Sequence, residues 1–290
     1  MVKHILNLTK EEKKDFLASF DNVFSDCDGV IWMVSRPINN VGPAFTLLQE
    51  AGKSIKFISN SSYRTDAGYI QTLSAIGIKD VKPDDLIHPD KTIITFLKSH
   101  PKYKSLFPIV GPIFKEGLIS SGFKIDEMPL KTEEFTLQSF TESIIPSNPV
   151  DAVLIDIDLN LSLAKFCRAL LHAKNNPDSK DVLVPGVEEL IDYMENYTGK
   201  KSIILGKPGE QLGHHIMDLF NISCPKRNLF IGDNLSTDIG FANSLGFQTL
   251  FVLSGVHSYE DMMKAKAENK PTYFADGVVD FIQFFEELNK

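Results

Sequence analysis

The chain has 290 residues, of which 43% are hydrophobic, and this is enough apolar material for one large or two medium cores. A formal net charge of −8 argues against a nucleic-acid partner or an anionic membrane surface, because clustered Lys and Arg hold those partners. Three cysteines without a Cys-x-x-Cys spacing indicate neither a disulfide framework nor a structural zinc site.

The beginning of the chain does not have the pattern of a targeting segment. Residues 1–20 are rich in Lys and Glu and lack a continuous apolar stretch, so a solvated helix over 8–20 explains them better than a signal peptide. No apolar run reaches the roughly 18 residues that a membrane span requires. We therefore expect a cytoplasmic protein in a reducing compartment.

Strands and helices alternate in the first part of the chain. After the first helix we expect strands over 23–25, 55–58 and 86–87, separated by helices over 42–51 and 65–76 and followed by a helix over 90–98. Such alternation predicts a parallel sheet with helices on both faces. The sequence Ser99-His100-Pro101 interrupts the pattern, because the residue before a proline disfavours helix, and we expect a domain boundary there.

The middle of the chain has its own alternation. It contains apolar runs at 107–110 and 152–157, helices over 113–121, 162–174 and 185–196, and an irregular connection between 125 and 150 with a short strand at 134–138. This segment is too long for a loop and has enough apolar residues for a core of its own. We therefore expect a second domain, inserted into the first.

From residue 202 the first pattern resumes. We expect strands over 202–205, 229–231 and 249–252, and helices over 210–220, 237–245, 259–268 and 278–288. The predicted fold is α/β, with a Rossmann-like parallel sheet core formed by 1–100 and 202–290 and an inserted α/β domain at 101–201. No G-x-G-x-x-G follows a strand, so the sequence lacks the glycine-rich turn with which dinucleotide-binding proteins of this fold class hold the pyrophosphate.

Two carboxylates stand one residue apart where the first buried strand ends. Asp26 and Asp28 should point to the same side of an extended chain, at the sheet edge where open α/β proteins have their chemistry, and Gly29 lets the backbone turn directly afterwards. Two ionised acids this close require a cation, a proton or a surface position. A solvated Asp-x-Asp-Gly turn is the alternative that the spacing alone leaves open.

Three further segments follow apolar runs: Ile-Ser-Asn-Ser-Ser at 58–62, Leu-Gly-Lys-Pro at 205–208 and Ile-Gly-Asp-Asn-Leu-Ser-Thr-Asp at 231–238. With Asp-Cys-Asp-Gly-Val-Ile-Trp at 26–32, they resemble the four motifs of the haloacid dehalogenase-like phosphatases, over nearly the whole chain. The resemblance is to the NagD-like branch, which includes p-nitrophenyl (4-nitrophenyl) phosphatases, phosphoglycolate phosphatase and pyridoxal phosphate phosphatase. It implies a Mg²⁺-dependent phosphomonoesterase that cleaves small phosphorylated metabolites or aryl phosphates through an aspartyl-phosphate.

The resemblance also assigns catalytic roles by position. Asp26 matches the nucleophile, and Asp28 matches the acid/base that protonates the leaving group and then activates water. Lys207, held between a glycine and a proline after an apolar run, matches the cation that stabilises the phosphoryl group. A solvated surface lysine is the common alternative.

Residues after the second strand match the segment that holds the phosphoryl oxygens. Ser59 and Asn60 stand at the motif positions, and Ser61 replaces an Asn that the family often has. The resemblance therefore implies that one hydrogen bond to the substrate or nucleophile is weakened or supplied otherwise. The same cluster is also typical of a turn or a helix start.

The metal ligands implied by the resemblance are Asp26, the backbone carbonyl of Asp28, and Asp233. Such hard oxygen donors suit Mg²⁺. Asp238 and Asn234 are expected to support the site, with Asp238 orienting Lys207 or a metal-bound water. An acid that favours a helix N-terminus is the alternative for Asp238.

Other chemically active side chains are weaker candidates. The adjacent His214 and His215 point about 100° apart on a helix, so we expect surface residues rather than a metal site. Cys27 should be buried on the opposite face of the strand from the two acids. Trp32 either lines the entrance to the site or packs between the two domains.

Two alternatives to a hydrolase stay open: a phosphotransferase or phosphomutase that passes the phosphoryl group to an alcohol, and a non-catalytic relative that binds a phosphorylated ligand. The expected partner is a small-molecule phosphate ester, and a homodimer formed through the inserted cap domain is a possible assembly.

Residues 175–184 are shorter than the family pattern. They predict either a more open entrance with weak discrimination among esters or a different lid with a narrow preference.

Overall fold

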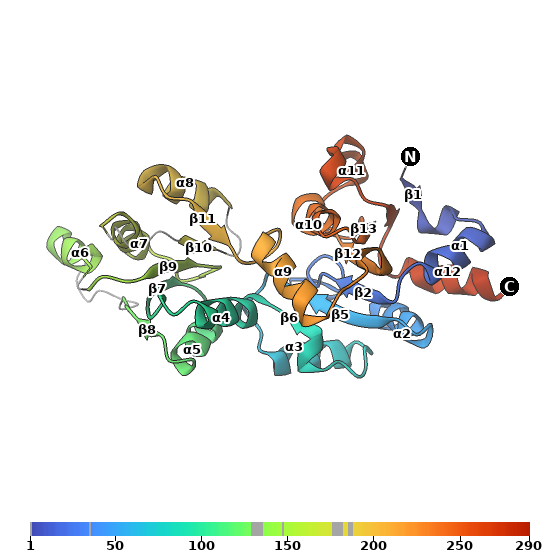
Figure 1. Ribbon diagram of the computed structural model, residues 1–290, viewed down its shortest axis with the longest axis horizontal. Coiled ribbons are helices and arrows are strands. Elements are labelled where there is room, and N and C mark those ends of the chain that lie inside the picture. The colour runs from blue at the N-terminus through green and yellow to red at the C-terminus, as the bar shows by residue number, and fades with distance from the viewer. Residues whose placement is uncertain (1, 35, 129–135, 147, 176–181, 185–187) are drawn as a thin grey trace. The chain divides into compact units, whose positions relative to one another are not determined.

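Figure 1 shows the computed structural model, which describes residues 2–34, 36–128, 136–146, 148–175, 182–184 and 188–290. The chain forms two compact units. The first unit comprises Met1–Ser59, Thr65–Ile87 and Gly213–Lys290, and the second comprises Asn60–Arg64 and His88–Leu212. The domain boundaries expected after residues 100 and 201 stay a prediction, and residues 176–181 of the shortened segment lie outside the described part of the chain.

A parallel sheet organises the first unit (Figure 1). Its strands are β1 (Lys3–His4), β2 (Asn22–Ser25), β5 (Ser54–Ile58), β6 (Leu86–Ile87), β12 (Asn228–Gly232), β13 (Gln248–Val252) and β14 (Tyr273–Ala275). Among the described residues they lie in the order β1-β14-β13-β12-β2-β5-β6, and each neighbouring pair is parallel. The parallel α/β sheet expected from the sequence is confirmed. A separate antiparallel pair, β3 (Trp32–Met33) and β4 (Arg36–Pro37), follows β2.

Both faces of this sheet are buried, which explains why its strands are nearly continuous apolar runs. In β12, Leu229 and Ile231 join a hydrophobic cluster with α1 (Lys10–Ala18), α2 (Val41–Glu50), α3 (Asp66–Ala75) and α12 (Asp280–Asn289). The residue between them, Phe230, packs on the other face against Phe241 of α10 (Phe241–Ser244), with ring centroids 6.1 Å apart. Two further helices of the C-terminal part are α9 (Glu210–Leu219) and α11 (Tyr259–Lys264).

One helix of the first unit begins differently from the expectation. Where the sequence predicts a helix over 237–245, the structure has a π-helix over Leu235–Gly240 that leads into α10. The side chain of Asn234 accepts hydrogen bonds from the backbone N–H groups of Ser236 at 3.0 Å and Thr237 at 3.1 Å. This cap starts the helical turn two residues earlier, directly after β12.

A second parallel sheet organises the second unit. Its strands are β7 (Ser105–Ile109), β8 (Lys124–Ile125), β9 (Ala152–Ile155), β10 (Val182–Val184) and β11 (Ser202–Ile204), and within the described residues they lie in the order β11-β10-β9-β7-β8. Val153 and Ile155 of β9 pack toward α7 (Leu163–Asn175) and α8 (Glu188–Thr198). Ala152 and Leu154 pack toward α4 (Pro89–Ser99) and α5 (Pro112–Ser120).

Two expected strands in this region are corrected. The strand expected over 202–205 is β11, which pairs with β10 in the second sheet and does not join the first. In place of a strand at 134–138, helix α6 (Leu137–Ile144) begins at Leu137, while 134 and 135 lie outside the described residues. Thr136 caps this helix by accepting the backbone N–H of Ser139 at 3.0 Å. In the described part of the chain, no helix has both the length and the apolar character to cross a bilayer.

Candidate active site

The first pair of acids stands at the carboxyl end of β2, in the middle of the first sheet. The backbone N–H of Asp26 donates to the carbonyl of Ile231 at 2.9 Å, so the pairing of β2 with β12 continues to the first acid. The carboxylate of Asp26 is buried, while Asp28 is half-buried. Cys27 between them is buried, as expected.

A tight turn follows Asp28 and brings Trp32 back to it. Gly29 has a φ of 79°, and its N–H donates to the carbonyl of Trp32 at 2.7 Å. The indole Nε1 of Trp32 donates to Oδ1 of Asp28 at 3.0 Å, and the ring is 1% exposed. Trp32 thus packs in the hydrophobic cluster of the first unit and bonds Asp28, a role that differs from the two considered in the sequence analysis.

The second pair of acids follows the neighbouring strand β12. Asp233 comes directly after the strand, and its Oδ2 accepts the backbone N–H of Val256 at 2.7 Å. Asp238 lies in the π-helix, and its Oδ2 accepts the backbone N–H of Asn234 at 3.0 Å. A Cβ on Gly232 would lie 2.3 Å from the Cβ of Asp238, so only glycine permits this approach.

Three of these carboxylates form one cluster. Asp26, Asp233 and Asp238 each offer an oxygen atom within 4.8 Å of the others, and all three side chains are buried. Buried carboxylates this close repel one another unless a cation or a proton is present. Their oxygen donors fit a hard divalent cation such as Mg²⁺.

Another cluster in the first unit has a different character. His4 lies 3.4 Å from a carboxylate oxygen of Asp280 and 3.7 Å from one of Asp276. Its Nδ1 accepts the backbone N–H of Leu6 at 3.2 Å, so in the neutral ring Nε2 carries the proton and faces the acids. The neutral ring therefore presents an N–H group and no lone pair to the two acids, and we assign this cluster no metal.

The loop after β13 completes the site, and the sequence analysis missed it. Ser254 Oγ donates to the carbonyl of Gly29 at 2.6 Å, which ties this loop to the turn after the first acids. A Cβ on Gly255 would lie 1.9 Å from Oδ2 of Asp233. Because β13 neighbours β12 in a parallel sheet, the carboxyl ends of both strands lie at the same edge. The small residues directly after β13 were the sequence feature that could have indicated this loop as part of the site.

The remaining predicted residues lie in both units. Ser59 ends β5, its N–H donates to the carbonyl of Ile87 at 2.9 Å, and its side chain is buried. In the second unit the side-chain amide of Asn60 donates to the carbonyl of Lys207 at 2.9 Å and accepts the N–H of Lys207 at 2.9 Å. Lys207 is buried, and its peptide bond to Pro208 is cis. Ser61 is half-buried, in the same segment as Asn60.

The two histidines of α9 are not part of the carboxylate cluster. His214 is exposed and His215 is half-buried. The cluster found around Asp26 contains neither of them. The expected surface position is confirmed for His214, whereas His215 is partly covered.

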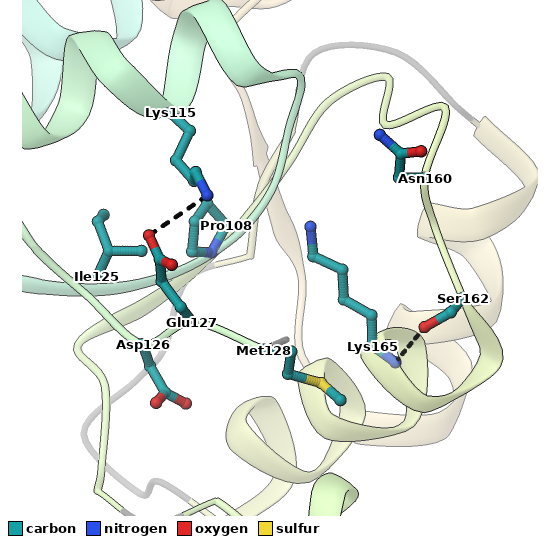
Figure 2. A pocket seen from close by; sticks show the side chains of 9 residues that line it. All are labelled: Pro108, Lys115, Ile125, Asp126, Glu127, Met128, Asn160, Ser162 and Lys165. Atoms are coloured by element: carbon teal, nitrogen blue, oxygen red, sulfur yellow. Dashed lines mark hydrogen bonds and ion pairs between the residues drawn. The ribbon is translucent and has the colours of Figure 1, made fainter. Parts of the chain in front are cut away.

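A cavity of about 230 Å³ lies in the second unit, and none of the predicted site residues lines it (Figure 2). Lys115 and Lys165 reach into it, but Lys115 lies 3.3 Å from Glu127 and Lys165 lies 2.5 Å from Asp158. The backbone N–H of Lys165 donates to Ser162 Oγ at 3.1 Å. Both cations therefore have acidic partners, and we assign this cavity no part in the chemistry.

Comparisons with known proteins match two parts of the chain to one family. A model described as haloacid dehalogenase-like hydrolase matches residues 23–124, and a second, described as HAD-hydrolase-like, matches residues 204–281. Together the matches span more than half of the chain and contain all four acids of the site.

Curated relatives and a solved structure match most of the chain. Phosphoglycolate phosphatase 2 of Arabidopsis thaliana is 26% identical over 96% of this chain and 98% of its own length. The 4-nitrophenylphosphatase of Schizosaccharomyces pombe is 29% identical over 92% and 95%. The glycerol phosphate phosphatase of Mycobacterium tuberculosis in complex with magnesium shares the fold, with a TM-score of 0.71 and 17% identity over 92% of this chain and 78% of that one.

Proposed function

The chain belongs to the haloacid dehalogenase-like hydrolases, and on that premise we propose that it is a Mg²⁺-dependent phosphatase that cleaves small phosphate monoesters through an aspartyl-phosphate. The observation that carries the proposal is the meeting of Asp26, Asp233 and Asp238 at the ends of two adjacent strands, with Asp28 two residues after Asp26 in the chain. Relatives named phosphoglycolate phosphatase and 4-nitrophenylphosphatase support this class of substrate.

In the proposed reaction Asp26 is the nucleophile. One of its carboxylate oxygens attacks phosphorus, the bond from phosphorus to the ester oxygen breaks, and Asp28 gives its proton to the departing oxygen. Asp28 then takes a proton from water, which attacks the phosphorus of the aspartyl-phosphate. This second step releases inorganic phosphate and restores Asp26, so every proton and bond is accounted for.

The residues around the acids support this division of roles. Trp32 fixes the orientation of Asp28 through the hydrogen bond to Oδ1, and a fixed carboxyl group is what directed proton transfer requires. Ser59, Asn60 and Ser61 would bind the phosphoryl oxygens. Lys207 would neutralise the charge that they carry in the transition state.

Mg²⁺ would be held by Asp26, Asp233 and the backbone carbonyl of Asp28, with Asp238 and Asn234 in support. Asp233 is itself fixed by the N–H of Val256, and Asp238 by the N–H of Asn234, so both carboxylates have defined orientations. When bound, the cation would neutralise the phosphate and lower the repulsion between the ester and the attacking carboxylate.

Hydrolysis of p-nitrophenyl phosphate in the presence of Mg²⁺ tests the proposal. We expect release of p-nitrophenol and of inorganic phosphate in equal amounts, with radioactive phosphate from a labelled ester trapped on the protein after an acid quench. Addition of small alcohols distinguishes a phosphotransferase, because phosphate would then fall below p-nitrophenol. A pure protein that binds phosphate esters but releases neither product would refute the assignment as a hydrolase.

A further inference from the structure

A buried acid of the second unit, Asp156, lies outside the machinery described so far. It follows β9, and its backbone N–H donates to the carbonyl of Ile109 at 2.7 Å, which extends the pairing of β9 with β7. The side chain is 1% exposed. One of its oxygens accepts a hydrogen bond from the hydroxyl of Ser62. The other, Oδ1, has no hydrogen-bond partner among the described residues.

Ser62 belongs to the segment Asn60–Arg64, which we call the phosphate loop. Three polar side chains of this loop bond it to the rest of the second unit. The side-chain amide of Asn60 forms two hydrogen bonds of 2.9 Å with the backbone of Lys207, one to its carbonyl and one from its N–H. The hydroxyl of Ser62 donates to Asp156. The hydroxyl of Tyr63 donates to the carbonyl of Ile157 at 3.2 Å and accepts the N–H of Leu159 at 3.2 Å.

The strength with which Asp156 holds Ser62 in the buried position depends on whether Asp156 is protonated. Burial raises the pKa of Asp156 from its ordinary value of 3.8 to about 7, against the opposing effects of the Ser62 hydroxyl and the backbone N–H of Ile157. The negative charge of Asp90 adds to the rise. In the neutral acid the carboxyl O–H can donate to the Ser62 oxygen, so only a carbonyl-like oxygen is left unpaired. The ionised form is a buried charge whose loss of water outweighs its hydrogen bonds, so it is less favourable in this position.

Few other charges act on this carboxyl group. Asp90, at the start of α4, is hydrogen-bonded to His88. In the segment after β9, Asp158 forms an ion pair with Lys165 at 2.5 Å. Arg64 is the cation of the phosphate loop itself. Asp90 and Asp158 thus each have a basic partner in this unit.

We propose that Asp156 is a positioning residue for the phosphate loop: as the neutral acid it holds Ser62, and with it the position at which Asn60 bonds both backbone groups of Lys207. Its ionisation releases the loop, because a buried carboxylate gains more from contact with water in an open loop than from its hydrogen bond with Ser62. This inference rests on the proposed function, because the loop carries the residues that would bind the phosphoryl group. Asp156 touches neither substrate nor cation and acts through Ser62 alone.

Nuclear magnetic resonance of the whole chain tests the coupling without reference to activity. In the wild type, the backbone amide signals of Ser62 and Tyr63 should shift with a midpoint near pH 7, the value to which burial raises the pKa of Asp156. In Asp156→Asn, which is neutral at every pH, they should stay constant between about pH 6 and pH 8. Asp158→Asn is the matched control: it removes a charge two residues away, and the loop signals should still titrate.

Kinetics with p-nitrophenyl phosphate then connect the loop to the reaction. The ratio of wild-type to Asp156→Asn kcat/KM should fall about tenfold from pH 6 to pH 8, because ionisation removes the holding form from the wild type alone. The Asp158→Asn ratio should not change with pH. If Asp156→Asn does not fold, Ser62→Ala replaces it, since this variant keeps the acid and loses the contact.

The outcomes separate this inference from the proposed function. Loop signals that do not titrate in the wild type, or that titrate equally in Asp156→Asn, overturn the role of Asp156 whatever the activity. A parallel pH dependence of kcat/KM in wild type and variant also overturns it. Titrating loop signals in a protein that cleaves no phosphate ester support the coupling and count against the proposed phosphatase activity alone.

Discussion

Trp32 and Asp28 are joined side chain to side chain, with the indole Nε1 donating to Oδ1 of the acid at 3.0 Å. The turn between them is closed by the hydrogen bond of 2.7 Å from the N–H of Gly29 to the carbonyl of Trp32. The buried indole therefore belongs to the same rigid turn as the acid that it orients. This relationship leads to a prediction that separates proton transfer from nucleophilic attack.

Trp32→Phe keeps a large aromatic ring and removes the donor. We expect kcat for alkyl phosphates, whose leaving oxygen needs a proton, to fall about tenfold or more. The effect on p-nitrophenyl phosphate should be much smaller, because its leaving group departs without protonation. Steady-state kinetics on both esters measure the difference, and an equal loss on both would mean that Trp32 has only a packing role.

Replacement of the two acids should have different effects. Asp26→Asn should lower kcat at least about 10⁴-fold and abolish trapping of labelled phosphate on the protein, because no nucleophile remains. Asp28→Asn should slow hydrolysis about 10²- to 10⁴-fold while Mg²⁺ still binds. Acid-quench labelling and calorimetric titration with Mg²⁺ provide the two measurements. An Asp26→Asn protein with activity close to wild type would contradict the mechanism.

Gly255→Ala should weaken the cation site from the loop after β13. The added Cβ would lie 1.9 Å from Oδ2 of Asp233 and must displace that carboxylate, so we expect Mg²⁺ affinity to fall about tenfold or more. Gly277→Ala is the matched control, since the nearest atom to its Cβ lies 3.5 Å away. Calorimetric titration of both variants with Mg²⁺ checks the result. Equal affinities would show that Asp233 is not a ligand.

Removal of the cation should abolish activity reversibly. Chelation leaves the three buried carboxylates without a counter-charge, and Mg²⁺ should restore turnover. Ca²⁺ should bind but suppress hydrolysis, because it prefers more ligands and a looser geometry. Activity measured after dialysis against chelator and after addition of each cation decides the matter. Undiminished hydrolysis by the metal-free protein would exclude the proposed cation.

Asp156 should also make stability depend on pH. Its pKa is raised to about 7 in the folded state, from 3.8 in the unfolded chain. Between these two pH values the carboxyl group is ionised in the unfolded chain but protonated in the folded protein, so the free energy of unfolding falls as pH rises. Asp156→Asn has no such loss. Relative to wild type, it should therefore gain stability from pH 4 to pH 8, by at most about 4 kcal/mol. Urea unfolding at both pH values measures the gain, and Asp158→Asn should not show it.

The resemblance implied that Asp26 and Asp233 belong to one site. The structure brings the two acids together because they follow β2 and β12, which are parallel neighbours whose carboxyl ends meet at one edge. Burial of Cys27 followed from the alternation of side chains along an extended chain.

The missed features depend on long-range packing. Ser254 and Gly255 are residue types found in any turn. Their place in the site follows only from the pairing of β13 with β12, which the sequence does not show. The strand β11 has the same apolar pattern in either sheet, and its pairing with β10 decides where it belongs. At 134–138 the alternating residues suggested a strand, but the cap provided by Thr136 starts a helix at Leu137. The contact between Ser62 and Asp156 joins segments 94 residues apart.

The pairing of β2 with β12 also determines the order in which the molecule can fold. Asn22 and Asn228 are hydrogen-bonded at 2.9 Å although 206 residues separate them. The strand β2, which precedes Asp26, therefore lacks one neighbour until most of the chain has been synthesised. Contacts of such long range form slowly. Until then the apolar edge of β2 is open to pairing with other chains, which makes the nascent protein prone to aggregation. A chain that stops before β12 would contain Asp26 and Asp28 without the structure that makes them an active site.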